Sequence, residues 1–234
     1  MKLINSIKRD FTTMTWVLMP VAIAINIVIG QIVALLKLPV YLDSIGTVLV
    51  AAVAGPWAGA LTGTLSNIIW GLIIDPNALP WFPVAFFIGF VAGWCAVAGL
   101  FRSWWKVMIT GFLVGLTAAI VSTPIAVYLY GGITASGSSF ITAYLIQTGR
   151  GILESVLSTN FLVEPVDKIT NCLLAFAIIL GLSSRYLARF PRPENVEVEK
   201  SRRSTEIIAA IVVSILLIAL YAFIFVRLIT PAGG

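Results

Sequence analysis

Long uncharged stretches separated by short charged segments run through the whole chain and predict an all-α integral membrane protein. A helix needs about 20 apolar residues to cross the hydrocarbon core of a bilayer. Residues 16–36, 81–101, 107–130 and 207–226 each reach this length without one charged side chain. Each of these four stretches therefore predicts one spanning helix.

A further uncharged stretch, residues 44–74, is too long for one crossing. A straight helix of this length would extend about 46 Å, whereas the bilayer core is about 30 Å thick. Gly55-Pro56 lies near its middle and is a strong turn motif. We therefore predict two shorter helices, over residues 41–54 and 57–74.

The segment after residue 130 has a mixed pattern. Residues 131–139 are rich in glycine and serine, as loops are, and residues 142–162 combine apolar positions with Arg150 and Glu154, which are spaced as a helical pair. This pattern predicts an interfacial or re-entrant segment. A sixth core helix is expected over residues 165–185, with a charged first turn.

These elements give a domain organisation of six core helices and one appended helix. Residues 1–190 form the core, and residues 191–205 are expected to be a basic cytoplasmic linker with two prolines. Residues 206–234 then carry the seventh, C-terminal transmembrane helix.

Composition excludes a soluble protein and several kinds of chemistry. Hydrophobic residues make up 59% and charged residues 11% of the chain, against roughly 45–50% and about 25% in soluble proteins. The chain has no histidine and no G-x-x-x-x-G-K-[ST] stretch, so histidine catalysis and ATP hydrolysis by a P-loop are not expected. Cys95 and Cys172 lie in apolar runs and are interpreted as packing residues. We predict no enzyme activity, no metal site and no cofactor.

Basic residues predict the orientation in the membrane. With the N-terminus in the cytoplasm and seven alternating spans, eleven of the fifteen lysines and arginines lie inside and four lie outside. The positive-inside rule therefore favours a multi-pass protein of the cell membrane with a cytoplasmic N-terminus. The net charge of +5 is explained by this topology and does not indicate nucleic-acid binding.

Small residues spaced four apart predict close helix contacts. Gly59 and Gly63 lie on one face of the helix predicted over residues 57–74, and Gly55 continues this spacing in the turn before it. Gly30 and Ala34 repeat the spacing in the first predicted helix. Such faces let helix backbones approach closely in lipid. One interpretation is packing inside the chain. The other is a docking face for another membrane subunit, for which the three-glycine face is the preferred candidate.

Polar and aromatic side chains gather on the predicted outer side of the membrane. Polar groups at membrane depth usually face a cavity or a partner, and aromatic walls with a few carboxylates and amides suit a small organic ligand. The alternative is an interfacial aromatic belt with ordinary loop charges. The candidate substrate-binding residues are Asp43, Asn67, Trp70, Asp75, Trp81, Tyr128, Arg150, Glu154, Asn160, Glu164 and Asn171.

Two segments resemble a known family. Residues 42–71, LDSIGTVLVAAVAGPWAGALTGTLSNIIWG, resemble the hairpin of the second and third helices of the substrate-binding S components of energy-coupling factor (ECF) transporters. Residues 164–185, EPVDKITNCLLAFAIILGLSSR, resemble the sixth helix of that family. The resemblance covers about residues 11–190, and the seventh helix is an addition to the family's layout.

The resemblance implies a binding subunit of an ABC-type importer. An S component captures a vitamin or similar micronutrient beneath its outer loops, while a membrane coupling subunit and two ATPase subunits, all separate chains, drive uptake. The absence of a P-loop agrees with this division of labour. A membrane sensor or scaffold and a self-sufficient secondary transporter remain as alternatives. The outer side holds five acidic residues and only three basic ones near the expected pocket, which favours a neutral or cationic aromatic ligand.

Overall fold

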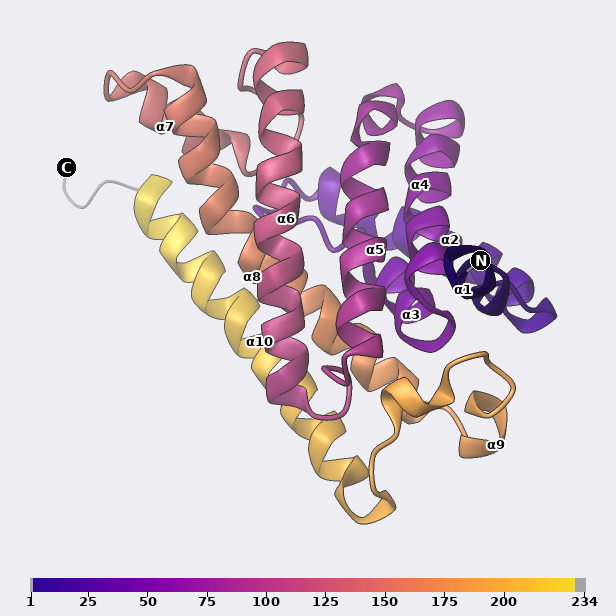
Figure 1. Cartoon of the computed structure of the whole chain (residues 1–234). Helices are drawn as coiled ribbons and strands as arrows, with labels where there is room; N and C mark the ends of the chain where they lie inside the picture. Colours follow the sequence, from indigo (N-terminus) through magenta and orange to yellow (C-terminus); the bar gives the residue numbers. More distant parts are fainter. Residues whose placement is uncertain (1, 230–234) are drawn as a thin grey trace.

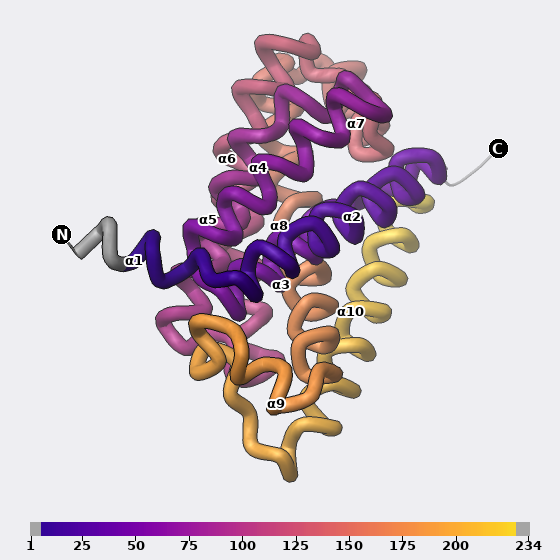
Figure 2. Tube along the Cα trace, turned by 90° about the vertical axis from the view of Figure 1, so that its right-hand side faces the viewer, coloured from indigo at the N-terminus to yellow at the C-terminus, as the bar shows by residue number. Residues whose placement is uncertain are grey.

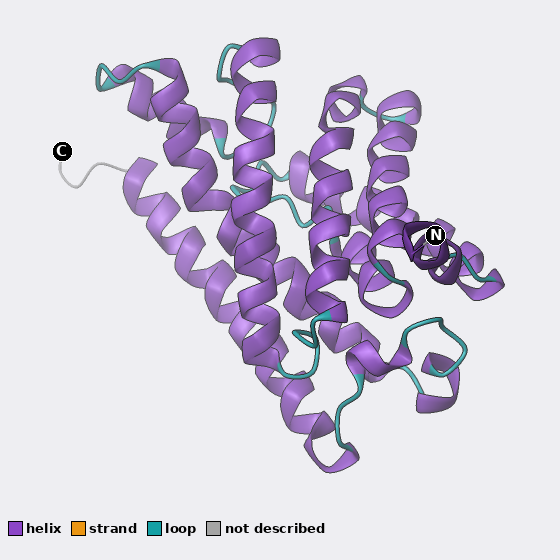
Figure 3. Cartoon of the chain, viewed as in Figure 1, coloured by secondary structure: helices purple, strands orange, loops and turns teal. Residues whose placement is uncertain are grey.

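The computed structural model describes residues 2–229, and within them the side chains of residues 6–227. This part of the chain is almost entirely helical and contains no strand (Figure 3). Two short 3-10 helices, η1 and η2, lie at Pro76–Trp81 and Pro193–Val196. The α-helices are α1 (Lys2–Asp10), α2 (Thr13–Leu35), α3 (Ile45–Ala54), α4 (Pro56–Ile73), α5 (Phe82–Val97), α6 (Trp104–Tyr130), α7 (Ser139–Gln147), α8 (Ile152–Gly181), α9 (Ser184–Leu187) and α10 (Lys200–Ile229).

The helices form one bundle around α3. All residues of α3 are buried, and this helix contacts α2, α4, α5 and α8. Helices α4, α5 and α6 stand side by side, and α10 runs along the outer side of α8 (Figure 1). Seen after a quarter turn, α2 crosses the bundle obliquely in front of α3 and α8 (Figure 2). The short, fully buried α3 is therefore the centre of the fold.

Within the described residues, four helices are long and apolar enough to cross a membrane. They are α2, the combined segment of η1 and α5, α6, and α10. Helix α10 exposes most of its apolar surface, including Ile208, Ile215 and Phe223, as expected of a helix that faces lipid. Helix α8 is long enough to span about 45 Å but carries four charged side chains. The chain is thus an all-α membrane protein, as its composition predicts.

The division of residues 44–74 into two helices is confirmed. Gly55 separates α3 from α4 with a φ of +122°, which a residue with a side chain adopts only with strain. Pro56 then occupies the first position of α4, where its missing N–H costs no helical hydrogen bond. A β-carbon at Gly55 would also collide with Asp10 and Arg192. The Gly-Pro pair therefore forms the turn between α3 and α4, and the missing side chain of Gly55 leaves space for Asp10 and Arg192.

The glycine face of α4 packs inside the chain, which favours internal packing, the first of the two interpretations of this face. A β-carbon at Gly59 would lie 2.9 Å from the carbonyl oxygen of Gly89 on α5, and one at Gly63 would collide with the carbonyl of Ala85. The space beside Gly55 is occupied by the side chains of Asp10 and Arg192. On α2, Gly30 packs against Trp70, and Gly30 and Ala34 line an internal cavity. The four glycines are therefore used for contacts within the chain, and Ala34 borders the cavity.

The expected interfacial segment and the helix after it form a different arrangement. Helix α7 is short, and α8 runs without a break through Pro165, which was expected to begin a new helix. Proline is tolerated at membrane depth when packing against neighbouring helices compensates for the lost hydrogen bond. Here Gly115 of α6 lets the backbone at Pro165 approach closely. The consequence is that Glu164 and Lys168 lie in the middle of α8 instead of in a first turn.

The expected linker at residues 191–205 is folded against the bundle. The backbone N–H of Arg192 donates to the carbonyl of Val53, and the side-chain amide of Asn195 donates to the carbonyl of Ala52, both on α3. Helix α10 already begins at Lys200, within the expected linker. Buried backbone acceptors at the end of α3 need partners, and this segment supplies them.

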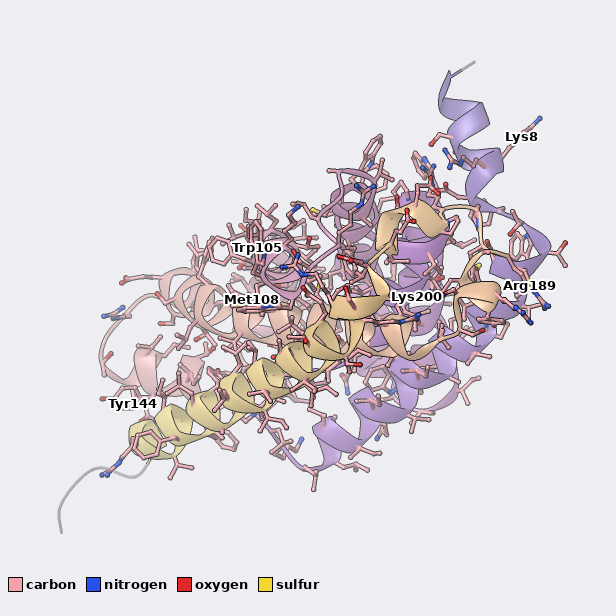
Figure 4. The ribbon with its side chains drawn as sticks, turned by 90° about the horizontal axis from the view of Figure 1, so that it is seen from below. Lys8, Trp105, Met108, Tyr144, Arg189 and Lys200 are labelled. Carbon is pink, nitrogen blue, oxygen red and sulfur yellow. The ribbon has the colours of Figure 1, made fainter. Side chains whose placement is uncertain are left out.

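Helix α1, which the apolar pattern did not indicate, joins the same contacts through Asp10. Its carboxylate is fully buried, accepts 2.8–2.9 Å hydrogen bonds from the guanidinium of Arg192, and accepts a 3.0 Å hydrogen bond from the N–H of Trp57. Burial raises the pKa of Asp10 above its usual value, while Arg192 and the Trp57 N–H act in the opposite direction. In Figure 4, the side chains of Lys8 and Arg189 point away from the bundle.

Candidate functional site

A cavity of about 340 Å³ lies among α2, α4, α6 and α8. Residues of the segments 37–44 and 132–139 also line it. Small-molecule sites are typically concave, of this size or larger, and apolar except for a few placed polar groups. The cavity brings together seven of the eleven candidate residues: Asp43, Asn67, Trp70, Asp75, Trp81, Asn160 and Glu164.

The other four candidates do not line the cavity. Tyr128 is 85% exposed on the outside of α6. Arg150 and Glu154 form an exposed ion pair with a nitrogen–oxygen distance of 3.5 Å, so their spacing has a local role. Asn171 is buried below the cavity and hydrogen-bonds the backbone at Ser44 and Asp167. The sequence pattern places these residues on the same predicted side of the membrane as the pocket. Only the packing of the helices shows that they do not line it.

Aromatic side chains form one wall of the cavity and are held in place by hydrogen bonds. Trp81 and Tyr130 stack with ring centroids 5.6 Å apart and an interplanar angle of 9°. The hydroxyl of Tyr130 donates to the carbonyl of Asn77, which fixes the end of α6 against η1. The indole N–H of Trp70 donates to the side-chain oxygen of Gln31 on α2. Flat surfaces are therefore presented in fixed orientations to anything that enters.

A buried charge cluster lies at the α8 side of the cavity, centred on Lys168. Its ammonium group lies 2.6 Å from Asp167, 3.2 Å from Asp43 and 3.6 Å from Glu164, and 5.3 Å from the centre of the Tyr41 ring. The Lys168 side chain is only 2% exposed. Because an isolated charge at this depth would be very costly, the lysine is retained by the carboxylates around it.

Asp167 and Asn171 hold the segment before α3 against α8. One carboxylate oxygen of Asp167 accepts hydrogen bonds from the N–H groups of Tyr41 and Leu42, at 2.8 and 2.9 Å. The side-chain oxygen of Asn171 accepts a 3.0 Å hydrogen bond from the N–H of Ser44. Leu42 has a φ of +50°, a strained conformation for a residue with a side chain, and these bonds maintain it. Asp43 is thereby positioned beside Lys168.

Two polar side chains of the cavity wall have hydrogen-bonding capacity that the chain does not use. One oxygen of Glu164 is completely buried and has no hydrogen-bond partner among the described residues. The side-chain amide of Asn67, which is 8% exposed, makes no hydrogen bond within the described part of the chain. Unsatisfied buried polar groups in a native structure call for an explanation, and a bound molecule is one.

The segment 132–139 closes the cavity beside residues 37–44. Lys37 donates a 2.8 Å hydrogen bond to the carbonyl of Ala135, and the hydroxyls of Tyr41 and Ser138 lie 2.9 Å apart. A β-carbon at Gly137 would collide with the backbone at Lys37 and Leu38. The two connecting segments therefore contact each other directly over the cavity, which gives them the position of a cover.

Several residues of the site were not predicted. Lys168, Tyr41, Tyr130 and Gln31 line the cavity or hold its walls but were not among the candidates. For Lys168 a pattern did exist, because its spacing of four from Glu164 places both side chains on one face of a helix. Tyr41 and Gln31 are brought to the site by tertiary contacts alone.

The fold and the cavity together define a helical membrane protein with an internal site of small-molecule size. No group of histidine, cysteine or acidic side chains among residues 2–229 is arranged to hold a metal ion. Comparison of the chain with models of protein families, with curated proteins and with solved structures found no match. The site is therefore interpreted from its own residues and from the resemblance of residues 42–71 and 164–185.

Proposed function

We propose that the chain is the membrane-embedded substrate-binding subunit, or S component, of an ECF-type importer for a vitamin or a similar micronutrient. The single observation that carries the proposal is the cavity, whose walls combine fixed aromatic rings with the unused polar groups of Asn67 and Glu164. Both segments that resemble the family contribute to its walls, Asn67 from residues 42–71 and Glu164 from residues 164–185. In this role the chain binds its ligand and catalyses no reaction.

We also propose a location in the cell membrane with a cytoplasmic N-terminus. Three basic regions meet at one end of the fold, because Arg9 pairs with Glu194 and Arg102 donates to the carbonyl of Glu194. Residues 132–139, which line the cavity, follow the upper end of α6, whereas α9 and the start of α10 lie at the lower end (Figure 1). The positive-inside rule would place the basic end in the cytoplasm, so that the cavity would receive its ligand from outside.

The partners of this function are a membrane coupling subunit and two ATPase subunits, each a separate chain. The test is affinity purification of the tagged full chain from its native membrane in mild detergent, followed by identification of the bound proteins. A membrane subunit and paired ATPases are expected in the eluate. Uptake of a ligand into liposomes that hold this chain alone would contradict the proposal.

That liposome result would instead favour a self-sufficient secondary transporter. The exposed apolar surface of α10 is the feature that supports the other alternative, a membrane sensor or scaffold that binds a partner through this helix. Purification of the chain with a membrane protein other than a coupling subunit, lost when α10 is replaced by an unrelated apolar helix, would favour the scaffold.

A further inference from the structure

The carboxylate of Glu164 is the part of the cavity that the chain itself leaves incomplete. The residue is 4% exposed and lines the cavity, yet one carboxylate oxygen has no hydrogen-bond partner among the described residues. Its nearest charged neighbour is the ammonium of Lys168 at 3.6 Å, close enough for an ion pair but beyond a hydrogen bond. A buried carboxylate normally accepts several hydrogen bonds, so this group lacks a donor.

Lys168 forms an ion pair with Glu164 but no hydrogen bond, because its ammonium lies closer to two other carboxylates. It donates hydrogen bonds to Asp167 at 2.6 Å and to Asp43 at 3.2 Å. Three carboxylates thus share one ammonium, so carboxylates outnumber cations in this cluster. Buried clusters of like charge are strongly unfavourable unless a cation joins them.

The other basic side chain on the cavity wall does not supply that cation. Lys37 lies at the exposed rim, where its ammonium donates to the carbonyl of Ala135. Asp43 is about one quarter exposed and Glu164 lines the cavity, so both can be reached by a ligand, whereas Asp167 is fully enclosed. Two of the three carboxylates that share Lys168 therefore border the cavity.

We infer that the ligand of this cavity carries a positively charged nitrogen that binds between Glu164 and Asp43, attached to a flat ring that packs against the aromatic wall. An ammonium or charged ring nitrogen would donate to, or lie beside, the part of the Glu164 carboxylate that borders the cavity and balance the cluster. The stacked pair of Trp81 and Tyr130 offers ring faces, which attract cations as well as flat rings. This inference rests on the proposed function, because it assigns the ligand class of the same cavity.

The test measures binding of small probes to the full chain in lipid nanodiscs. Thiamine and pyridoxamine are the cationic probes, pyridoxine is the uncharged counterpart of pyridoxamine, and pantothenate and folate are the anionic probes. A cationic probe is expected to bind at least about tenfold more tightly than uncharged or anionic probes. Glu164→Gln, which keeps the shape and removes the charge, should weaken that binding roughly ten- to hundredfold.

Glu154→Gln is the matched control, since Glu154 lies on the same helix but is exposed and away from the cavity. It should leave the dissociation constants unchanged within about twofold, and thermal unfolding without ligand verifies that each variant is folded. Preferred binding of an uncharged or anionic probe, or no binding of either cationic probe, would overturn the inference about charge. Co-purification with a coupling subunit would still support the proposed function in that case, so the two can fail separately.

Discussion

Asn26 connects three helices through one side chain. Its oxygen accepts a 2.7 Å hydrogen bond from the N–H of Gly46 on α3, and its nitrogen donates to the hydroxyls of Thr47 and Ser66, on α3 and α4. Gly46 is required at this crossing because a β-carbon there would collide with the carbonyl of Ala22 on α2. Interhelical hydrogen bonds of this kind specify which helix faces meet in a membrane protein.

Replacing Asn26 with leucine should therefore destabilise the protein. The change leaves the buried N–H of Gly46 without its acceptor and the hydroxyls of Thr47 and Ser66 without their donor, and is expected to cost about 2–3 kcal/mol. Thermal unfolding in detergent micelles measures the effect, with Ile32→Ala, an exposed position on the same helix, as the control. An unfolding temperature equal to that of the wild type would show that the network does not hold these helices.

At the scale of whole elements, α4 and α5 approach each other through glycine. Gly59 faces the backbone of Gly89 on α5 and the side chain of Ala51 on α3. This contact leaves no room for a side chain, and close backbone approach is the main source of helix association in lipid.

Gly59→Leu is expected to reduce the yield of folded protein and ligand binding together. Overpacking of a tight contact typically costs about 1–3 kcal/mol, and here the neighbouring atoms include backbone that cannot move aside. Gly181→Leu is the control, because nothing lies within 4 Å of a β-carbon at that helical glycine. Normal folding and binding with selective loss of transport would instead restore the interpretation of Gly59 as a contact for a coupling subunit.

The segment between α9 and α10 is fixed to the bundle by the ion pair of Asp10 and Arg192. Arg192→Ala would leave the buried carboxylate of Asp10 without its partner, which typically costs about 3–5 kcal/mol. We expect faster cleavage by protease within residues 191–200 and a lower unfolding temperature. Arg189→Ala, an exposed arginine nearby, should change neither. Equal cleavage of both variants would mean that other contacts hold this segment.

At the scale of the molecule, α10 packs on α8 but does not reach the cavity. It is joined to the bundle by its buried residues Ala210, Ser214 and Tyr221 and by a hydrogen bond that the N–H of Trp104 donates to the carboxylate of Glu206. None of the described residues that line the cavity belongs to α10.

Deletion of residues 204–234 should therefore leave the cavity in place and lower stability. The expected result is a lower unfolding temperature with binding of a cationic probe such as thiamine retained within about threefold, measured in nanodiscs. The truncation would expose the α8 surface to lipid, which tolerates apolar groups well. Complete loss of binding in a truncated protein that still unfolds cooperatively would show that α10 shapes the site from a distance.

Most helices could be predicted from the sequence because each depends on a local property. The uncharged stretches predict α2, α5, α6 and α10, and the Gly55-Pro56 pair predicts the break between α3 and α4. The path of residues 142–185 could not be predicted in this way. Pro165 and the charges around it are typical of a helix start, but packing on α6 and the ion pairs of Lys168 allow the helix to continue.

The sequence by itself determined that this is a helical membrane protein, because length and hydrophobicity of the stretches fix the environment of each helix. It also indicated seven of the cavity residues, through polar and aromatic types at membrane depth. Only the tertiary structure decided that Tyr128, Arg150 and Glu154 face outward and that Asn171 supports the backbone. Which side chains share a cavity depends on helix rotation and on contacts between distant segments, and no local pattern encodes these.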